Sequence, residues 1–447
     1  FYHTVDIFSN NVNCDEVIRS ELSTYKVTIQ EPNVAVDEHQ NKGTWTAIFG
    51  QGFEVIIGGK KWFAFYKYTE DKDGNYTSHC SETMTGWFHD AAPIVPATPP
   101  LHWGCYHGEK AGPKTVRVHA PSSAMDSDEI FKAEDELQKM LEEKATTWTV
   151  GPNMLEGMTL RDAKRRIGGG RSRRHVAQQL SATHASEEVD PKLPKSFSWR
   201  NVDGALVPVR DQQQCGSCYA FGATEMMSAR VRIGLLRQGK KVPKTPSIFD
   251  PMVAMLSPQH VVSCSQYSQG CDGGFEYLVA KYGQDFGIVS DHCFAYESGL
   301  RVQENTAVPC EYQCPESQRY FVHDYHYVGG YCGNSSVPQL MEELVTGGPI
   351  SVGILCTPDF MHYQSGIFKP VKGAERYAKN PFEVCISHKF CCCLSTTVRV
   401  KWCADLCFCR TQTMLFYSLA TAKRMAPSTG RYRIAGAQAG VNEAFSG

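Results

Sequence analysis

The sequence has little net charge and no long apolar run. Across 447 residues, 45 lysines and arginines are balanced by 47 aspartates and glutamates, so the formal net charge is −2. A nearly neutral chain lacks the basic surface that nucleic acids require, and we expect no nucleic-acid partner. No apolar segment is long enough to cross a bilayer, which favours a soluble protein without a membrane partner. No signal segment follows Phe1, so we expect that the natural N-terminus was removed or is missing.

Cysteine, by contrast, is abundant. Twelve of the 19 cysteines lie before residue 360, scattered as in a disulfide framework, and seven lie between Cys385 and Cys409. Together with the glycosylation sequons that begin at Asn75 and Asn334, they indicate an oxidising, secretory compartment. The crowded cysteines could also suggest zinc. Their spacing gives no paired-ligand pattern, so we predict no metal site.

Residues 1–110 have the pattern of β-structure. The segments 53–57 and 62–68 flank Gly58 and Gly59, and glycine at both turn positions favours a tight hairpin. In the second strand, Trp62, Ala64, Tyr66 and Tyr68 would share one face. A β-sandwich or barrel without chemistry of its own explains this pattern equally well.

The sequence pattern changes after this region. Apolar residues at helical spacing predict a helix over about 127–148. The basic, glycine-containing run at 164–174 cannot pack as a core, so we interpret it as an exposed, protease-accessible linker. A nucleic-acid patch is the competing interpretation, disfavoured by the neutral chain. From Leu193 onward the pattern becomes mixed helix and strand, which indicates a second, larger domain.

The most informative segment is 208–221, which reads PVRDQQQCGSCYAF. Cys218 begins an apolar, helix-compatible stretch that runs to about Arg237. Because the positive end of a helix dipole stabilises a thiolate, Cys218 is the candidate nucleophile. Gln212, six residues earlier, is placed to donate an amide hydrogen bond to the oxyanion that forms after attack. The alternative, that Cys218 is one more disulfide half, leaves the rest of the segment unexplained.

The pattern CGSCY at 215–219 is that of the papain-family cysteine peptidases. Further segments that resemble this family lie at 193–200, 256–264 and 270–274. The resemblance implies an α+β fold: a papain-like two-subdomain catalytic unit, with its cleft between a helical half and a β-rich half. It also implies that Gly273 and Gly274 let the substrate backbone approach closely. The disulfides that it implies are Cys215–Cys271, Cys264–Cys310 and Cys293–Cys314.

Within the family, the sequence is similar to the dipeptidyl peptidase I (cathepsin C) branch. The segments that carry this similarity are 51–55, 61–65, 82–87, 263–267 and 325–330. The branch implies a β-barrel exclusion domain at 1–110 that blocks one end of the cleft, so that dipeptides leave the free N-termini of peptides and proteins. It also implies a lysosomal or secretory homo-tetramer. A propeptide and basic linker at 111–192 would precede the catalytic domain at 193–383, which makes the chain a zymogen.

The same branch implies one cofactor, a chloride ion that shapes the second subsite. Phe275, Tyr277 and Tyr327 occupy the positions that hold this ion in the family. A phenol hydroxyl is a donor that suits an anion. Ordinary core tyrosines give the same sequence pattern.

The chain departs from the family pattern at its beginning. Residues before Cys14 do not resemble the family's opening, which carries the aspartate that binds the substrate's free amine. Cys14 is then the expected partner of Cys105, which leaves Cys80 without its own. If dipeptide selection is lost, the alternative function is that of a papain-like endopeptidase.

A larger departure begins at Val384. The family continues there to its catalytic histidine and later to an Asn-Ser-Trp-Gly block, which this chain lacks. His388, one residue late, is the candidate base, and a coincidental histidine is the alternative. Residues 384–447 therefore form an aberrant tail, which we interpret as translated intron or a shifted frame because Val-Cys codons can begin with GT. A catalytically inactive homologue that binds peptides or inhibitors is the third possible function.

Overall fold

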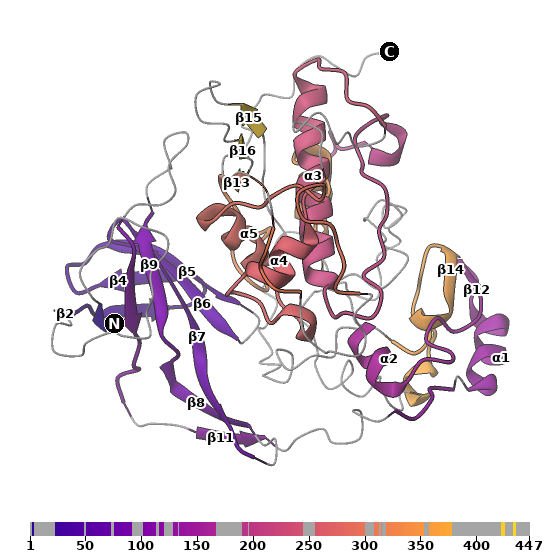
Figure 1. Cartoon of the computed structure of the whole chain (residues 1–447), viewed down its shortest axis with the longest axis horizontal. Coiled ribbons are helices and arrows are strands. Elements are labelled where there is room, and N and C mark those ends of the chain that lie inside the picture. The colour runs from indigo at the N-terminus through magenta and orange to yellow at the C-terminus, as the bar shows by residue number, and fades with distance from the viewer. Residues whose placement is uncertain are drawn as a thin grey trace. The chain divides into compact units, whose positions relative to one another are not determined.

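The computed structural model divides the chain into two compact units, residues 1–123 with 175–178, and residues 124–174 with 179–447 (Figure 1). The described residues are 2–3, 23–48, 51–72, 76–91, 102–112, 116–119, 128–132, 134–166, 190–194, 196–244, 255–299, 308–312, 314, 319–352, 357–377, 422–424 and 432–434. Within these residues, no helix has the length and apolar character that a membrane span needs.

Among its described residues, the first unit is an antiparallel sheet of half-barrel form with eleven strands. Its strands are β1 (Tyr2–His3), β2 (Ser23–Thr24), β3 (Val27–Gln30), β4 (Val34–Asp37), β5 (Lys42–Ile48), β6 (Gly52–Ile57), β7 (Lys60–Glu70), β8 (Tyr76–Thr83), β9 (Gly86–Asp90), β10 (Gly104–His107) and β11 (Val116–His119). The path runs β2-β1-β10-β9-β7-β6-β5-β4-β3, and β8 pairs with both β7 and β11.

The predicted hairpin at Gly58 and Gly59 is confirmed. Strands β6 and β7 pair with Ile57 opposite Lys60, and the two glycines between them have φ of 59° and 73°. Both values lie in the left-handed region that residues with a Cβ rarely adopt. The two glycines therefore fix the register of β6 against β7.

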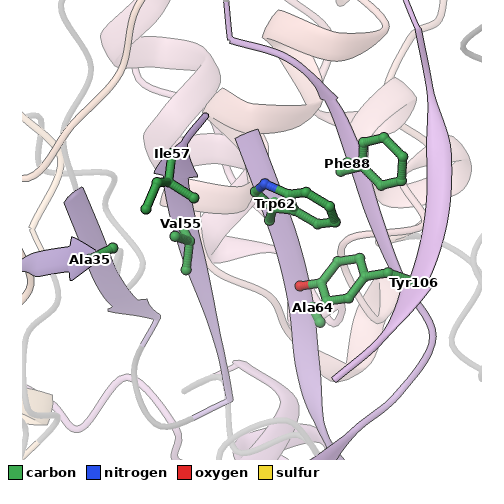
Figure 2. Packing of buried hydrophobic residues seen from close by; sticks show 7 residues of the cluster. All are labelled: Ala35, Val55, Ile57, Trp62, Ala64, Phe88 and Tyr106. Carbon is green, nitrogen blue, oxygen red and sulfur yellow. The ribbon is translucent and has the colours of Figure 1, made fainter. Parts of the chain in front are cut away.

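The apolar core of the first unit lies against β6 and β7 (Figure 2). Its buried members are Ala35, Val55, Ile57, Trp62, Ala64, Phe88 and Tyr106. The Trp62 ring stacks on Phe88 with centroids 4.5 Å apart and meets Tyr106 edge-on at 5.2 Å. Of the predicted one-face set, Trp62 and Ala64 are buried, whereas Tyr68 is 44% exposed. Strand β7 thus leaves the core towards its end.

The second unit holds the remaining helices and strands. They are α1 (Asp135–Lys144), β12 (Trp148–Val150), α2 (Leu160–Arg166), α3 (Cys218–Arg237), α4 (Pro258–Cys264), α5 (Glu276–Asp285), β13 (Tyr320–Val322), α6 (Val337–Thr346), β14 (Tyr363–Gly366), β15 (Ala422–Arg424) and β16 (Tyr432–Ile434). Strand β16, from the tail after residue 384, pairs with β13 in parallel and with β15 antiparallel.

Helix α3 is the centre of the second unit and packs against α4 and α5 (Figure 1). Every residue from Cys218 to Leu235 is buried, the charged ones included. Its buried arginines have acceptors, as burial of a charge requires. Arg230 Nη2 donates to Glu343 Oε1 at 2.9 Å, and Arg232 Nε donates to the Gly204 carbonyl at 2.7 Å.

The helix predicted over 127–148 is shorter, because α1 spans only Asp135–Lys144. Ile130 instead forms an isolated β-bridge with Thr159, so the segment before α1 is extended. After α1 the chain enters β12, which pairs with β14 with Trp148 opposite Gly366. The apolar face of α1 packs into a cluster with Trp148, Val371 and Ala374. The segment predicted to be a propeptide therefore shares a core with residues 357–377.

A buried histidine joins the same two segments. His362 Nδ1 lies 3.0 Å from the Gly151 carbonyl oxygen, and its Nε2 lies 3.2 Å from Asn153 Nδ2. Asn153 Oδ1 accepts the Leu155 N–H at 2.9 Å, which turns Nδ2 towards the imidazole. His362 Nε2 is therefore the acceptor and Nδ1 carries the proton. Burial lowers the pKa of His362, so the ring stays neutral.

The disulfides implied by the family resemblance are present. Cys215 is bonded to Cys271, Cys264 to Cys310, and Cys293 to Cys314. Cys105 is also disulfide-bonded, whereas its expected partner Cys14 lies outside the described residues.

Candidate active site

Cys218 is the first residue of α3. Its side chain is a thiol and not a disulfide half, so that alternative interpretation is wrong. The residue is 1% exposed and stands at the positive end of a helix of 20 residues. The first turn of a helix leaves backbone N–H groups without helical partners, and catalytic cysteines of peptidases are found at such termini.

Gln212 is fully buried beside this helix terminus, and its amide orientation is fixed. Its Nε2 donates to the Cys215 carbonyl at 3.0 Å and to the Arg166 carbonyl at 3.2 Å. Because both acceptors are carbonyl oxygens, the nitrogen rather than the oxygen must face them. Gln213, the next residue, has φ of 53°, a left-handed value that Asp211 Oδ1 supports by accepting the Gln213 N–H at 2.7 Å. The strained turn thus presents an oriented amide donor.

The Cys215–Cys271 disulfide joins this turn to the glycine pair. The two Cα atoms are 4.7 Å apart, and the Gly216 N–H donates to the Cys271 carbonyl at 2.9 Å. Gly273 follows with φ of 118°, which a residue with a Cβ would rarely adopt. A Cβ on Gly274 would lie 2.6 Å from the Tyr219 ring. Glycine is therefore needed at both positions, and the backbone there is left open to approach.

Tyr219 fixes the other side of the glycine pair. Its hydroxyl donates to the Gly270 carbonyl at 3.0 Å. Burial raises the pKa of Tyr219, so the phenol keeps the proton that it donates. The residue after the candidate nucleophile thereby holds the start of the segment that carries Gly273 and Gly274.

Arg210 anchors the strand-like segment that leads into the Gln212 turn. Its guanidinium donates to Glu225 at 3.3 Å and to Asp291 at 3.1 Å, and it lies over the Phe221 ring at 5.3 Å. Burial raises the pKa of both carboxyl groups, and the neighbouring guanidinium opposes that shift. Glu225 and Phe221 both belong to α3, so the turn and the helix are held together by this network.

The three residues predicted to hold chloride lie around the start of α5. Phe275 is the N-cap of that helix, and Tyr277 is its second residue. The Tyr277 and Tyr327 rings stack with centroids 4.6 Å apart and planes inclined by 12°. All three side chains are at most 6% exposed. The structure thus brings two phenol groups together beside a helix N-terminus.

His388, the candidate base, lies outside the described residues, as does most of the tail from 384 to 447. Among the described residues, no group of three or more His, Cys, Asp or Glu side chains is arranged to hold a metal ion.

Sequence reasoning missed three residues that contact the site. Ser217 precedes the nucleophile, Tyr296 contacts both Ser217 and Gln212, and Arg166 supplies a carbonyl to Gln212. Ser217 lies inside the family pattern and was available as a signal. Tyr296 is far away in the sequence, and no local periodicity marks it. Arg166 was predicted to lie in the exposed linker at 164–174; that prediction is wrong for this residue, which ends α2 and has a side chain only 13% exposed.

Comparison with known proteins gives two family matches and several relatives. The papain family cysteine protease model matches residues 193–384, and the cathepsin C exclusion domain model matches residues 1–110. Cathepsin C of Schistosoma mansoni is 30% identical over 391 residues, which cover 83% of this chain and 77% of that relative.

Two further relatives match more narrowly. Cathepsin B-like CP1 of Giardia intestinalis is 29% identical over 218 residues, 48% of this chain and 65% of that protein. Dipeptidyl aminopeptidase 1 of Plasmodium falciparum is 28% identical over 232 residues, 40% of this chain and 32% of that protein. The chain therefore spans less than two thirds of each of these two relatives.

Proposed function

This chain belongs to the cathepsin C family of papain-type cysteine peptidases, and we propose that it removes dipeptides from the free N-termini of peptides and proteins. The two family matches confirm the predicted fold class, a papain-like peptidase unit preceded by an exclusion domain. By this resemblance the enzyme class is that of cysteine-type dipeptidyl peptidases. The observation that carries the proposal is the Cys218 thiol at the start of α3 with the oriented Gln212 amide beside it.

The reaction runs through a thioester. The Cys218 thiolate attacks the carbonyl carbon of the second peptide bond, and the carbonyl oxygen becomes an oxyanion that accepts hydrogen bonds from Gln212 Nε2. The oxyanion collapses, the C–N bond breaks, and the leaving amine takes a proton from an imidazolium, which we assign to His388. Water, deprotonated by the same imidazole, then hydrolyses the thioester and releases the dipeptide. The backbone at Gly273 and Gly274 would pair with the substrate in extended form.

The contact between Gln212 and Arg166 supports a zymogen. Arg166 ends α2, within the segment 111–192 that we assign to the propeptide and linker. Its carbonyl accepts from the amide nitrogen that we assign to the oxyanion, and its guanidinium lies 3.4 Å from Asp211. While this backbone is in place, the donor is already occupied. Excision of the segment would free it for substrate.

We also assign a chloride ion to Phe275, Tyr277 and Tyr327. The donor chemistry fits an anion, because two stacked phenols and the first turn of α5 all offer hydrogen-bond donors. The ion would supply a fixed negative charge at the second subsite. In that role the three residues shape the pocket for the second substrate side chain and take no part in bond cleavage.

Family membership also supports the assignments that concern the whole molecule. We assign a homo-tetramer in the lysosome or the secretory pathway, with peptides and protein N-termini as substrates. The three disulfides of the second unit fit an oxidising compartment. The exclusion domain at 1–110 would supply the restriction to dipeptides.

A second candidate is a catalytically inactive homologue that still binds peptides or inhibitors. The papain family match ends at residue 384, before His388. Without an imidazole, the thiol has no base to hold its proton and no acid to protonate the leaving amine. A papain-like endopeptidase is the alternative if the first unit does not restrict the substrate.

Fluorogenic peptide amides distinguish these functions. The full chain, before and after limited trypsin cleavage at the basic run 164–174, is offered a dipeptidyl amide with a free or an acetylated N-terminus. Turnover of the free form alone, appearing on cleavage and absent in C218S, is expected. C332S is the matched control, because Cys332 is the other buried cysteine outside a disulfide among the described residues, and it should retain activity. Cleavage of the acetylated form indicates an endopeptidase, and labelling of Cys218 by an epoxide without turnover indicates the inactive homologue.

A further inference from the structure

The hydroxyl of Tyr296 contacts both parts of the candidate active site. Its oxygen lies 2.8 Å from the main-chain carbonyl oxygen of Gln212 and 2.7 Å from Ser217 Oγ. Gln212 carries the predicted oxyanion donor, and Ser217 immediately precedes the nucleophile. One side-chain oxygen, 84 residues away from Gln212 in the sequence, therefore joins the two.

The directions of these hydrogen bonds follow from the groups involved. A carbonyl oxygen can only accept, so Tyr296 must give its single hydroxyl proton to Gln212. The proton between Ser217 and Tyr296 then comes from Ser217, whose hydroxyl is much closer to Tyr296, at 2.7 Å, than to the Cys215 carbonyl oxygen, at 3.4 Å. The result is a directed chain in which Ser217 donates to Tyr296 and Tyr296 donates to Gln212. Replacing the tyrosine hydroxyl by hydrogen breaks both links at once.

The side chain of Ser217 contacts Tyr296 and does not cap helix α3. It is the N-cap of α3, a position at which serine usually accepts a backbone N–H and contributes about 1 kcal/mol to stability. Here its side chain makes no capping hydrogen bond. It is fully buried and points its hydroxyl at Tyr296 instead. A departure from a local stability rule at the residue beside a nucleophile is typical of a functional constraint.

Tyr296 is itself held in place from several sides. Its ring meets the Phe221 ring of α3 edge-on with centroids 4.6 Å apart. The two residues that follow it donate their N–H groups to Gln259 Oε1 of α4, at 2.8 and 3.0 Å. Gly299 completes the segment, because a Cβ there would lie 2.8 Å from the Gln212 carbonyl oxygen and 2.6 Å from the Gln213 side chain. The segment 296–299 is thus built to lie tightly against the Gln212 turn.

We propose that Tyr296 is a positioning residue that holds the Gln212 oxyanion donor at a fixed place relative to Cys218. It touches neither substrate nor the reacting atoms, and acts through the Gln212 backbone and Ser217. The inference rests on the proposed function, because it assumes that an oxyanion forms beside Cys218. The turn that contains Gln212 also contains Gln213, whose backbone is in the strained left-handed conformation. The contacts of Tyr296 hold the turn in this conformation.

The expected effect is smaller than loss of the donor itself. Removing one oxyanion donor from a peptidase lowers kcat by about 10²–10³-fold, and Tyr296→Phe displaces the donor without deleting it, so we expect roughly a ten- to hundred-fold loss. The loss should appear in kcat with KM nearly unchanged, because ground-state binding of the peptide does not use the oxyanion. The phenyl ring that remains keeps the contact with Phe221.

Two reagents separate positioning from a merely structural role. A peptide aldehyde adds the Cys218 sulfur to its carbonyl carbon, and its oxygen takes the place of the oxyanion. Iodoacetamide alkylates the same sulfur with loss of iodide and forms no oxyanion. Both are measured on trypsin-cleaved full chain as wild type, Tyr296→Phe and Tyr312→Phe. Tyr312 is the matched control, because its hydroxyl also has two partners, His260 and Arg319.

The expected result for Tyr296→Phe is a ten- to hundred-fold weaker aldehyde affinity with an unchanged alkylation rate and pH profile. The control Tyr312→Phe should change neither the aldehyde affinity nor the alkylation rate. Unchanged aldehyde affinity, or equal losses in both reactions, would overturn the inference. A wild-type chain that binds the aldehyde but turns over no peptide overturns the proposed function alone. A wild-type chain that is alkylated but binds no aldehyde overturns the inference.

Discussion

Protonation of His260 should limit the stability of the second unit in acid. This residue of α4 is 1% exposed, and its Nε2 lies 3.3 Å from the Tyr312 hydroxyl. Arg319 also donates to that hydroxyl, at 2.7 Å, so its positive charge lies close to the imidazole. Burial, and then the Arg319 charge, lowers the pKa of His260 to about 3.

The sign and size of the effect follow from linkage. An unfolded histidine has a pKa of about 6.5, so between pH 6.5 and about 3 the unfolded chain binds a proton that the folded chain does not. The stabilisation is complete above pH 6.5 and is lost as the pH falls. Two pH units below 6.5, at pH 4.5, the loss amounts to about 3 kcal/mol, since each unit contributes about 1.4 kcal/mol.

The variant His260→Phe removes the titration and keeps a ring between Tyr282 and Tyr312. At pH 7 the substitution should lower the free energy of unfolding by about 1 kcal/mol, because one buried hydrogen bond is lost. From pH 7 to pH 4.5 its free energy of unfolding should fall by about 3 kcal/mol less than that of the wild type. Urea unfolding of the full chain at both pH values measures this difference. His326→Phe, at a partly exposed histidine, is the control and should follow the wild type. Equal losses in wild type and His260→Phe would refute the reasoning.

Three other substitutions have definite expected outcomes. Gly274→Ala should abolish peptide turnover while Cys218 remains alkylatable, because the new Cβ meets the Tyr219 ring at 2.6 Å. Asn153→Ala should lower the free energy of unfolding, measured with urea at pH 7, by about 1–3 kcal/mol, since the buried His362 Nε2 loses its donor; an unchanged free energy of unfolding would contradict that contact. Cys271→Ser should cost about 2–5 kcal/mol of stability, read from thermal unfolding, because it opens a loop whose ends are 56 positions apart in the sequence.

The features that the sequence predicted well are those that depend on local chemistry. The hairpin needed two left-handed residues, and Gly58 with Gly59 supplied them. The start of α3 at Cys218 followed from a turn that passes into an apolar run. The disulfide pairing followed from the family resemblance, because cysteine spacing alone does not fix connectivity.

Long-range contacts were not predictable in this way. The helix expected over 127–148 was too long, because the bridge between Ile130 and Thr159 competes with helical structure and depends on residues distant in the sequence. The contact of Tyr296 with Gln212 likewise has no local signature. Local sequence rules predict that the Ser217 side chain caps α3. Its hydroxyl instead bonds to Tyr296, a residue distant in the sequence.

The candidate active site needs neighbouring cysteines in opposite oxidation states, because the Cys215–Cys271 disulfide lies beside the Cys218 thiol. Cys218 must stay reduced to act as a nucleophile, while Cys215, three positions before it, must stay oxidised to tie the Gln212 turn to the glycine segment. A thiol reductant strong enough to rescue an oxidised Cys218 also attacks the bridge through a mixed disulfide. Activity should therefore pass through a maximum as the reductant is increased, and the redox poise of the compartment becomes a condition for an intact site.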